Sequence, residues 1–104
     1  MVTQQVTIRT VQSLAKQIMD SGIHLKRVYL YGSFARNQQH ENSDIDVALV
    51  ADEFTGVGFD DIRLFVRYLR KYTMIQARTY STEYFEQGDP FIDEIKETGI
   101  EINF

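Results

Sequence analysis

Two short motifs in the middle of the chain contain residue types that bind phosphate groups and divalent cations. Gly32 and Ser33 end the apolar run "RVYLYG", and Asp44 and Asp46 open the apolar run "DIDVALV", with ten residues between Ser33 and Asp44. A glycine lets the backbone approach a ligand closely, because it has no Cβ. A helix that begins at Ser33 would point free N–H groups at a phosphate. Arg36, about one turn further on, would add a charge-assisted hydrogen bond. The first motif is therefore a candidate phosphate site.

The second motif is a candidate metal site. Asp44 and Asp46 are two residues apart at the head of a predicted strand, so their side chains share one face. Two unpaired carboxylates this close repel each other, which raises the pKa of one of them. Mg²⁺ removes that conflict, and it is usually held by one or two carboxylates together with phosphate and water oxygens. The alternative is a pair of hydrated or Arg-paired aspartates at a strand entry. The nearby glycine and serine favour the metal site.

Length and composition restrict the class of protein. With 104 residues, 43% of them hydrophobic and 25% charged, the chain predicts one globular domain over residues 1–104. The absence of cysteine excludes disulfides, thiolate zinc sites and cysteine nucleophiles. We find no apolar run long enough for a membrane span and no signal-peptide pattern, so a cytoplasmic location is expected. The net charge of -4 argues against nonspecific nucleic-acid binding, which requires a basic surface.

The elements that must position the two motifs follow from hydrophobic periodicity and from turn residues. Helices and strands alternate, which predicts an α/β (α+β) domain of about four strands with helices packed on them. The predicted helices are 5–20, one or two turns over 33–37, a helix that starts at 60–61 and includes Leu69, and a helix over 90–98 between Asp89 and Gly99. The predicted strands are 27–31, 44–50, 74–80 and a short one in 100–104, and 38–43 is a polar loop.

The motif "GSFARN…SDIDVALV" resembles the signature of the nucleotidyltransferase superfamily that includes DNA polymerase beta, and most closely its small stand-alone members, the minimal nucleotidyltransferase (MNT) domains. The resemblance covers most of the chain and implies the nucleotidyltransferase fold with a mixed sheet. It implies that Gly32 and Ser33 hold a nucleoside triphosphate and that Asp44 and Asp46 carry Mg²⁺ as catalytic residues. The implied reaction transfers a nucleoside monophosphate, with AMP from ATP as the expected case, and releases pyrophosphate.

One position departs from the pattern of that family, which usually has a third carboxylate on the next strand, facing the pair. In this chain the aligned residue of "MIQARTY" is Gln76, and Arg78 shares its face. An amide is a weak metal ligand and a very poor base. No Asp or Glu lies between Asp61 and Glu83 to replace it. The sequence therefore leaves three functions open. They are an active Mg²⁺-dependent nucleotidyltransferase, a catalytically impaired module that binds a nucleotide or a partner, and an enzyme subunit completed by another chain's carboxylate or recognition domain.

A protein partner is implied by the same resemblance. MNT domains are often paired with a HEPN-domain protein in two-gene toxin–antitoxin systems, in which the MNT protein is the antitoxin and adenylylates its partner. A separate feature is a basic stripe on the predicted third helix, interpreted either as a solvated surface or as a docking site for an acidic partner; it consists of Arg63, Arg67, Arg70 and Lys71. From the sequence alone, no base-stacking role is assigned to any of the six tyrosines.

Overall fold

The sheet predicted from the sequence is present and has four strands. In the computed structural model, which describes residues 3–40 and 43–104, the strand order is β3-β2-β1-β4. β2 and β3 run parallel, whereas β1 is antiparallel to both β2 and β4. The α/β (α+β) domain with a mixed sheet is therefore confirmed. The strands are β1 (Leu25–Tyr31), β2 (Ile45–Ala51), β3 (Ile75–Ser81) and β4 (Ile100–Glu101).

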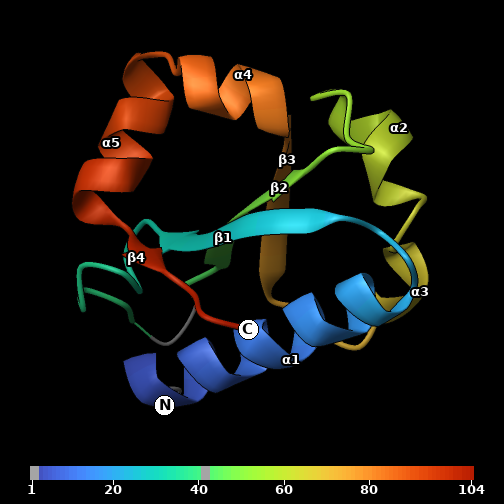
Figure 1. The fold of residues 1–104 in the computed structure, drawn as a ribbon. Helices are drawn as coiled ribbons and strands as arrows, with labels where there is room; N and C mark the ends of the chain where they lie inside the picture. The colour runs from blue at the N-terminus through green and yellow to red at the C-terminus, as the bar shows by residue number, and fades with distance from the viewer. Residues whose placement is uncertain (1–2, 41–42) are drawn as a thin grey trace.

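Helices cover both faces of the sheet (Figure 1). The long helix α1 lies along one face, and α4 and α5 pack on the other, whereas α2 and α3 lie in the connection from β2 to β3. Their bounds are α1 (Gln4–Asp20), α2 (Gly58–Ile62), α3 (Val66–Leu69), α4 (Thr82–Gln87) and α5 (Pro90–Thr98). In the described part of the chain, no helix is long and apolar enough to cross a membrane.

The caps predicted for the first and last helices are confirmed. The carboxylate of Asp89 accepts a hydrogen bond from the Ile92 N–H at 2.7 Å, Pro90 occupies the first turn of α5, and Gly99 follows its last residue. α1 ends one residue before Ser21, and Gly22 follows with a φ of 103°, a conformation that favours glycine. Turn chemistry alone thus predicted both ends of α5 and the end of α1.

Residues of β2 alternate between two hydrophobic clusters, one on each face of the sheet. Val47 and Leu49 pack in the larger cluster with α1, whereas Ala48 and Val50 pack in the smaller cluster with α4 and α5. Side chains two apart on a strand share a face. Asp46 therefore points to the α4–α5 side, near the start of β2.

The helix predicted from residues 60–61 to Leu69 is divided into two short helices, α2 and α3. The break falls at Phe65, whose φ of -137° is not helical. The Phe65 side chain is fully buried, and its ring centroid lies 5.6 Å from that of Phe54. A continuous helix was the wrong prediction because the chain bends to bury this one ring in the core.

Candidate functional site

Gly32 lies directly against the carboxylate of Asp46. Its φ is 76°, and a Cβ added at this position would overlap the carboxylate oxygen Oδ2 of Asp46. Both the backbone conformation and the available space thus exclude a side chain here. The sequence predicted that this glycine allows a close approach. In the structure the backbone of Gly32 comes close to Asp46, the predicted metal ligand, so the two motifs lie together.

The segment after Gly32 is a series of turns and not the helix predicted over 33–37. The Arg36 N–H donates to the Gly32 carbonyl at 3.2 Å, but Asn37 then adopts a left-handed φ of 55° and the coil ends. One hydrogen bond thus has α-helical spacing, but no regular helix follows for Ser33 to cap. The phosphate site at this segment stays a prediction. The polar loop predicted after it, 38–43, includes residues 41–42, which lie outside the described residues.

The turn segment is nevertheless held firmly in place beside the sheet. The Phe34 side chain is buried in the core. The side-chain amide of Gln4, in the first turn of α1, donates to the Phe34 carbonyl at 2.8 Å and to the Ala35 carbonyl at 3.2 Å. Ser33 and Arg36 are thereby fixed next to Gly32, with Arg36 exposed to solvent.

The two aspartates differ in their surroundings. Asp44 is exposed and Asp46 is half-buried. Burial raises the pKa of Asp46, and the charge of Asp44 raises it further, while the charges of Arg78 and Arg36 act in the opposite direction. The net rise means that the ionised form of Asp46 is not fully compensated by its neighbours. Arg36, predicted to serve a phosphate, therefore lies close enough to act on this site.

The third position is occupied as the sequence predicted. In the parallel pairing of β2 and β3, Asp46 lies opposite Gln76 and Ala48 lies opposite Arg78. Gln76 is exposed, so its amide can reach the same solvent-filled space as the two carboxylates. The strand register thus places a neutral side chain where a third acid would complete the cluster. Within residues 3–40 and 43–104, no group of three His, Asp or Glu side chains lies together as a metal site.

The donor set fits a hard divalent cation that completes its shell with other oxygens. Asp44 and Asp46 supply carboxylate oxygens, and Gln76 can supply an amide oxygen. The raised pKa of Asp46 identifies a carboxylate that a cation would stabilise in its charged form. Two carboxylates with phosphate and water oxygens are the usual surroundings of Mg²⁺. The metal assignment of Asp44 and Asp46 stays a prediction, and the residues present fit it.

Asp61 has a role that the sequence did not reveal. It was predicted as a helix-start residue, but its side chain is only 1% exposed. Its carboxylate accepts hydrogen bonds from the Thr55 N–H at 2.9 Å, the Gly56 N–H at 2.9 Å and the Thr79 hydroxyl at 2.7 Å. Burial acts to raise the pKa of Asp61, but these hydrogen bonds outweigh it, and the pKa lies below its ordinary value. Asp61 therefore ties the loop after β2 to β3.

The chain matches a known sequence family and several named relatives. Residues 11–103 match the family model described as polymerase beta, nucleotidyltransferase. The chain is 31% identical over 80 residues to the protein MJ0141 of Methanocaldococcus jannaschii, and the match covers 75% of this chain and 79% of MJ0141. It is 36% identical over 56 residues to MJ1379 of the same organism, covering 54% of this chain and 56% of that protein. The match thus spans little more than half the length of MJ1379. Both relatives are named as candidate protein adenylyltransferases.

A shorter match and two solved structures extend the comparison. The chain is 42% identical over 38 residues to the protein adenylyltransferase MntA of Shewanella oneidensis. This match covers 36% of this chain and 27% of MntA. A nucleotidyltransferase-like crystal structure from Sulfolobus solfataricus superposes with a TM-score of 0.69 at 21% identity, covering 94% of this chain and 80% of the other. A chain of a toxin–antitoxin complex crystallised with AMP-PNP superposes with a TM-score of 0.60 at 19% identity, covering 88% and 71%.

The two structural likenesses confirm the fold, and the family model covers nearly the whole chain, including the glycine–serine pair and both aspartates. This chain therefore belongs to the polymerase beta-type nucleotidyltransferase family.

Proposed function

We propose that this chain binds Mg²⁺ and ATP at Gly32, Ser33, Asp44 and Asp46 and transfers AMP to a hydroxyl group of a partner protein. The observation that carries the proposal is the contact between Gly32 and the Asp46 carboxylate, which joins the phosphate motif to the metal motif. The relatives named as protein adenylyltransferases support ATP as the donor and a protein as the acceptor.

The proposed reaction is the transfer of AMP from ATP to a hydroxyl group, and each part of it assigns a role to residues of the site. The acceptor oxygen bonds to the α-phosphorus while the bond from that phosphorus to the bridging oxygen breaks, and pyrophosphate leaves. A bound Mg²⁺ would supply positive charge to the triphosphate, and Asp44 and Asp46 would hold it. Arg36, exposed beside Gly32, would donate to a phosphate oxygen. The acceptor's proton passes to water, because the Gln76 amide cannot accept it.

The absence of a carboxylate at position 76 favours a second function. A positioned general base typically contributes about 10²–10⁴-fold to a rate. With Gln76 opposite Asp46, the chain would bind the nucleotide but turn it over slowly. In that case the domain acts by binding its partner, and nucleotide occupancy is a structural or regulatory feature.

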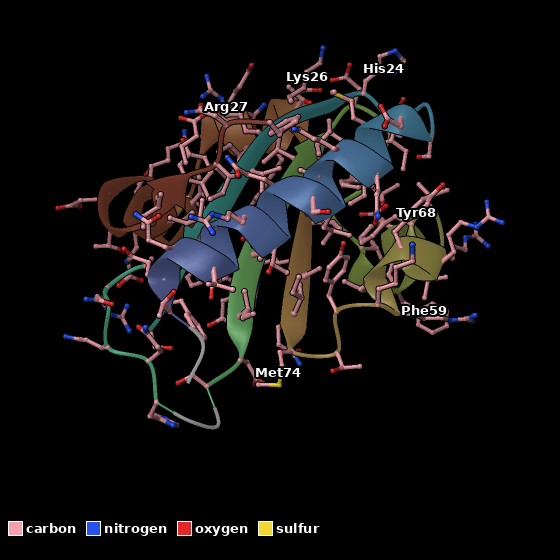
Figure 2. All side chains as sticks on the ribbon, turned by 90° about the horizontal axis from the view of Figure 1, so that it is seen from below. His24, Lys26, Arg27, Phe59, Tyr68 and Met74 are labelled. Atoms are coloured by element: carbon pink, nitrogen blue, oxygen red, sulfur yellow. The ribbon has the colours of Figure 1, made fainter. Side chains whose placement is uncertain are left out.

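We infer that the partner is a HEPN-domain protein of a toxin–antitoxin pair and that this chain is the antitoxin. The resemblance to MNT domains and the likeness to a toxin–antitoxin chain support this inference. The surface that fits a partner lies on α2, where Phe59 is 91% exposed; Figure 2 shows its ring at the periphery of the molecule. An apolar groove there is lined by Phe59, Ile62 and Val66, with Arg63 at its edge.

Charge indicates what kind of segment this surface would bind. All four residues of the basic stripe are exposed, and one of them, Arg63, also lines the groove; the stripe consists of Arg63, Arg67, Arg70 and Lys71. Exposed aromatic and apolar side chains that are flanked by arginines are typical of interface centres. We therefore expect an acidic segment with apolar anchors on the partner protein.

One experiment separates these functions. The protein is incubated with a HEPN-domain partner, Mg²⁺ and labelled ATP, and the partner's mass and label are measured. Transfer of AMP to the partner supports the enzyme, and a stable complex without transfer supports the binding module. Phe59→Ser should weaken the complex at least tenfold while leaving ATP affinity unchanged. Met19→Ser, at an exposed apolar position of α1, is the matched control and should change neither. If the chain neither binds such a partner nor labels it, the antitoxin assignment is wrong.

A further inference from the structure

A hollow lies on the face of the sheet to which Asp46 points. It is bounded by β3, by the start of α4, by the start of α5 and by the loop after β2, and its volume is about 550 Å³. This is within the usual size of small-molecule sites, about 300–1,000 Å³. The side chains that line it and carry the argument are Arg78, Tyr80, Tyr84, Asp89 and Phe91.

β3 leads directly from the candidate metal site into this hollow. Gln76 lies opposite Asp46, and Arg78 and Tyr80 follow on the same face of the strand. At about 3.3 Å per residue, Arg78 is about 7 Å and Tyr80 about 13 Å beyond Gln76. Arg78 lies opposite Ala48, which is only two residues beyond Asp46 on the same face of β2. Arg78 therefore stands at the junction between the hollow and the carboxylates.

Two aromatic rings of the hollow are open to solvent. Tyr84 is 46% exposed and Phe91 is 38% exposed, which is unusual for large rings in a concave site. The Tyr84 ring is parallel to that of Tyr80, with centroids 6.2 Å apart. The Phe91 ring meets the Tyr31 ring edge-on at 5.7 Å and carries the Arg78 guanidinium 4.8 Å from its centroid. The hollow thus presents two exposed aromatic rings, Tyr84 and Phe91, and each is packed against a neighbouring tyrosine ring.

The walls of the hollow are fixed before any ligand arrives. The Tyr84 hydroxyl donates to Asp89 at 2.6 Å, and the other oxygen of Asp89 caps α5. On the opposite side, the buried Asp61 carboxylate holds Thr55 and Gly56 in position. A site whose walls are held in this way loses little conformational entropy on binding.

We propose that this hollow binds the nucleoside part of a nucleoside triphosphate whose phosphates lie at Gly32, Asp44 and Asp46. The inference rests on the proposed function. Aromatic faces stack on any nucleobase, and Tyr84 and Phe91 supply such faces. Arg78, at the junction, binds the phosphate nearest the nucleoside while its guanidinium stays on Phe91.

The test compares Mg²⁺-dependent binding of ATP with that of inorganic tripolyphosphate, which lacks the nucleoside, by titration calorimetry. Wild type should bind ATP at least fivefold more tightly. Tyr84→Ser and Phe91→Ser should each weaken ATP binding about 5- to 150-fold, the range for removal of one base-stacking ring, and leave tripolyphosphate binding within twofold. Tyr72→Ser, a half-buried tyrosine in the cluster on the opposite face, is the matched control and should change neither.

The outcomes distinguish this inference from the proposed function. If wild type binds tripolyphosphate as tightly as ATP, the nucleoside does not occupy the hollow, although the phosphate site stands. If neither ligand binds, the proposed function is wrong and this inference falls with it. Tyr84→Phe keeps the ring and loses only the hydroxyl, so it should retain ATP affinity. Where circular dichroism shows that Tyr84→Ser is unfolded, the Phe91→Ser result decides.

Discussion

Replacing Gln76 by glutamate should supply the third carboxylate, with opposite effects in the absence and presence of Mg²⁺. Neighbouring strands are about 4.8 Å apart, so a carboxylate at position 76 comes within about 5 Å of Asp46. Two like charges at that distance repel by about 0.8 kcal/mol in water and about 3 kcal/mol at an effective dielectric constant of 20. Because residue 76 is exposed and Arg78 is nearby, we expect the metal-free protein to lose about 1–2 kcal/mol of its free energy of unfolding.

This loss corresponds to a fall in Tm of about 4–16 °C for a domain of this size. Adding Mg²⁺ should restore the Tm, because the cation converts the repulsion into coordination, and the Mg²⁺-induced increase should be larger than in wild type. Pyrophosphate release with ATP and an acceptor protein should rise, up to about 10²–10⁴-fold, since the new carboxylate is also a general base. Thermal unfolding with and without Mg²⁺ and a pyrophosphate assay measure the two effects.

The control is Gln5→Glu, the same chemical change at an exposed position of α1, which should shift stability by less than about 0.5 kcal/mol and leave the Mg²⁺ response unchanged. The variant Gln76→Glu with Arg78→Ala removes the cation that would pair with the new carboxylate. If Gln76→Glu neither lowers the metal-free Tm nor increases the response to Mg²⁺, residue 76 does not face Asp46. If the stability effects appear but turnover does not rise, position 76 is not where a base acts.

Three further predictions test the site and its support. Because the pKa of Asp46 is raised, its stabilising contribution is complete at acid pH and is lost as the pH rises through that pKa. Asp46→Asn should therefore raise the Tm of the metal-free protein at pH 7 and should give no increase below about pH 4. Thermal melts over a series of pH values measure this. Gly32→Ala should weaken Mg²⁺-dependent ATP binding at least tenfold, because the added Cβ displaces the Asp46 carboxylate. Gly22 also has a positive φ, but a Cβ added there meets no atom within 4 Å, so Gly22→Ala should lower stability alone. Equal ATP affinity in the two variants would contradict this. Because the pKa of Asp61 is lowered, its contribution is present above its unfolded pKa and is lost as the pH falls through the folded one. Asp61→Ala should cost about 3 kcal/mol in urea unfolding at pH 7, because it leaves the buried Thr79 hydroxyl and two partly buried backbone N–H groups without their acceptor. A cost as small as that of the exposed Asp60→Ala would refute this role.

The parts of the fold that could be predicted are those set by local patterns. Short runs of apolar, β-branched and aromatic residues located β1, β2 and β3, and the cap residues Asp89 and Gly99 located the ends of α5. The pairing of Asp46 with Gln76 was also predicted, because the family pattern fixes which residue of the third strand faces the aspartates. These predictions needed only neighbouring residues or a known motif.

The parts that could not be predicted depend on contacts between distant segments. A helix over 33–37 has only five residues, too few to be stable by itself, and the burial of Phe34 and the bonds from Gln4 determine its real shape. Asp61 receives hydrogen bonds from residues 6 positions before and 18 positions after it, so its sequence context, which is typical of a helix start, concealed its role.

The aromatic hollow was missed for the same reason. Tyr80, Tyr84 and Phe91 come from β3, α4 and α5 and meet only in the folded chain. Nothing in their sequence context distinguished them from core aromatic residues. The residue that could have indicated the hollow is Arg78. It is a cation on the same face of β3 as Gln76, which pairs with Asp46, and a cation there indicates a site for an anionic ligand.

The central claim is that Asp44 and Asp46 bind the cation of a Mg²⁺–nucleotide complex beside Gly32. The most direct measurement is the affinity for ATP, by titration calorimetry, with Mg²⁺ and with EDTA, for wild type and for Asp44→Asn/Asp46→Asn. We expect wild type to bind ATP at least tenfold more tightly with Mg²⁺ than with EDTA, and we expect the double variant to lose that difference, because the cation then has no carboxylate to bind. An affinity that is the same with Mg²⁺ and EDTA, or the same in wild type and the double variant, would contradict the claim.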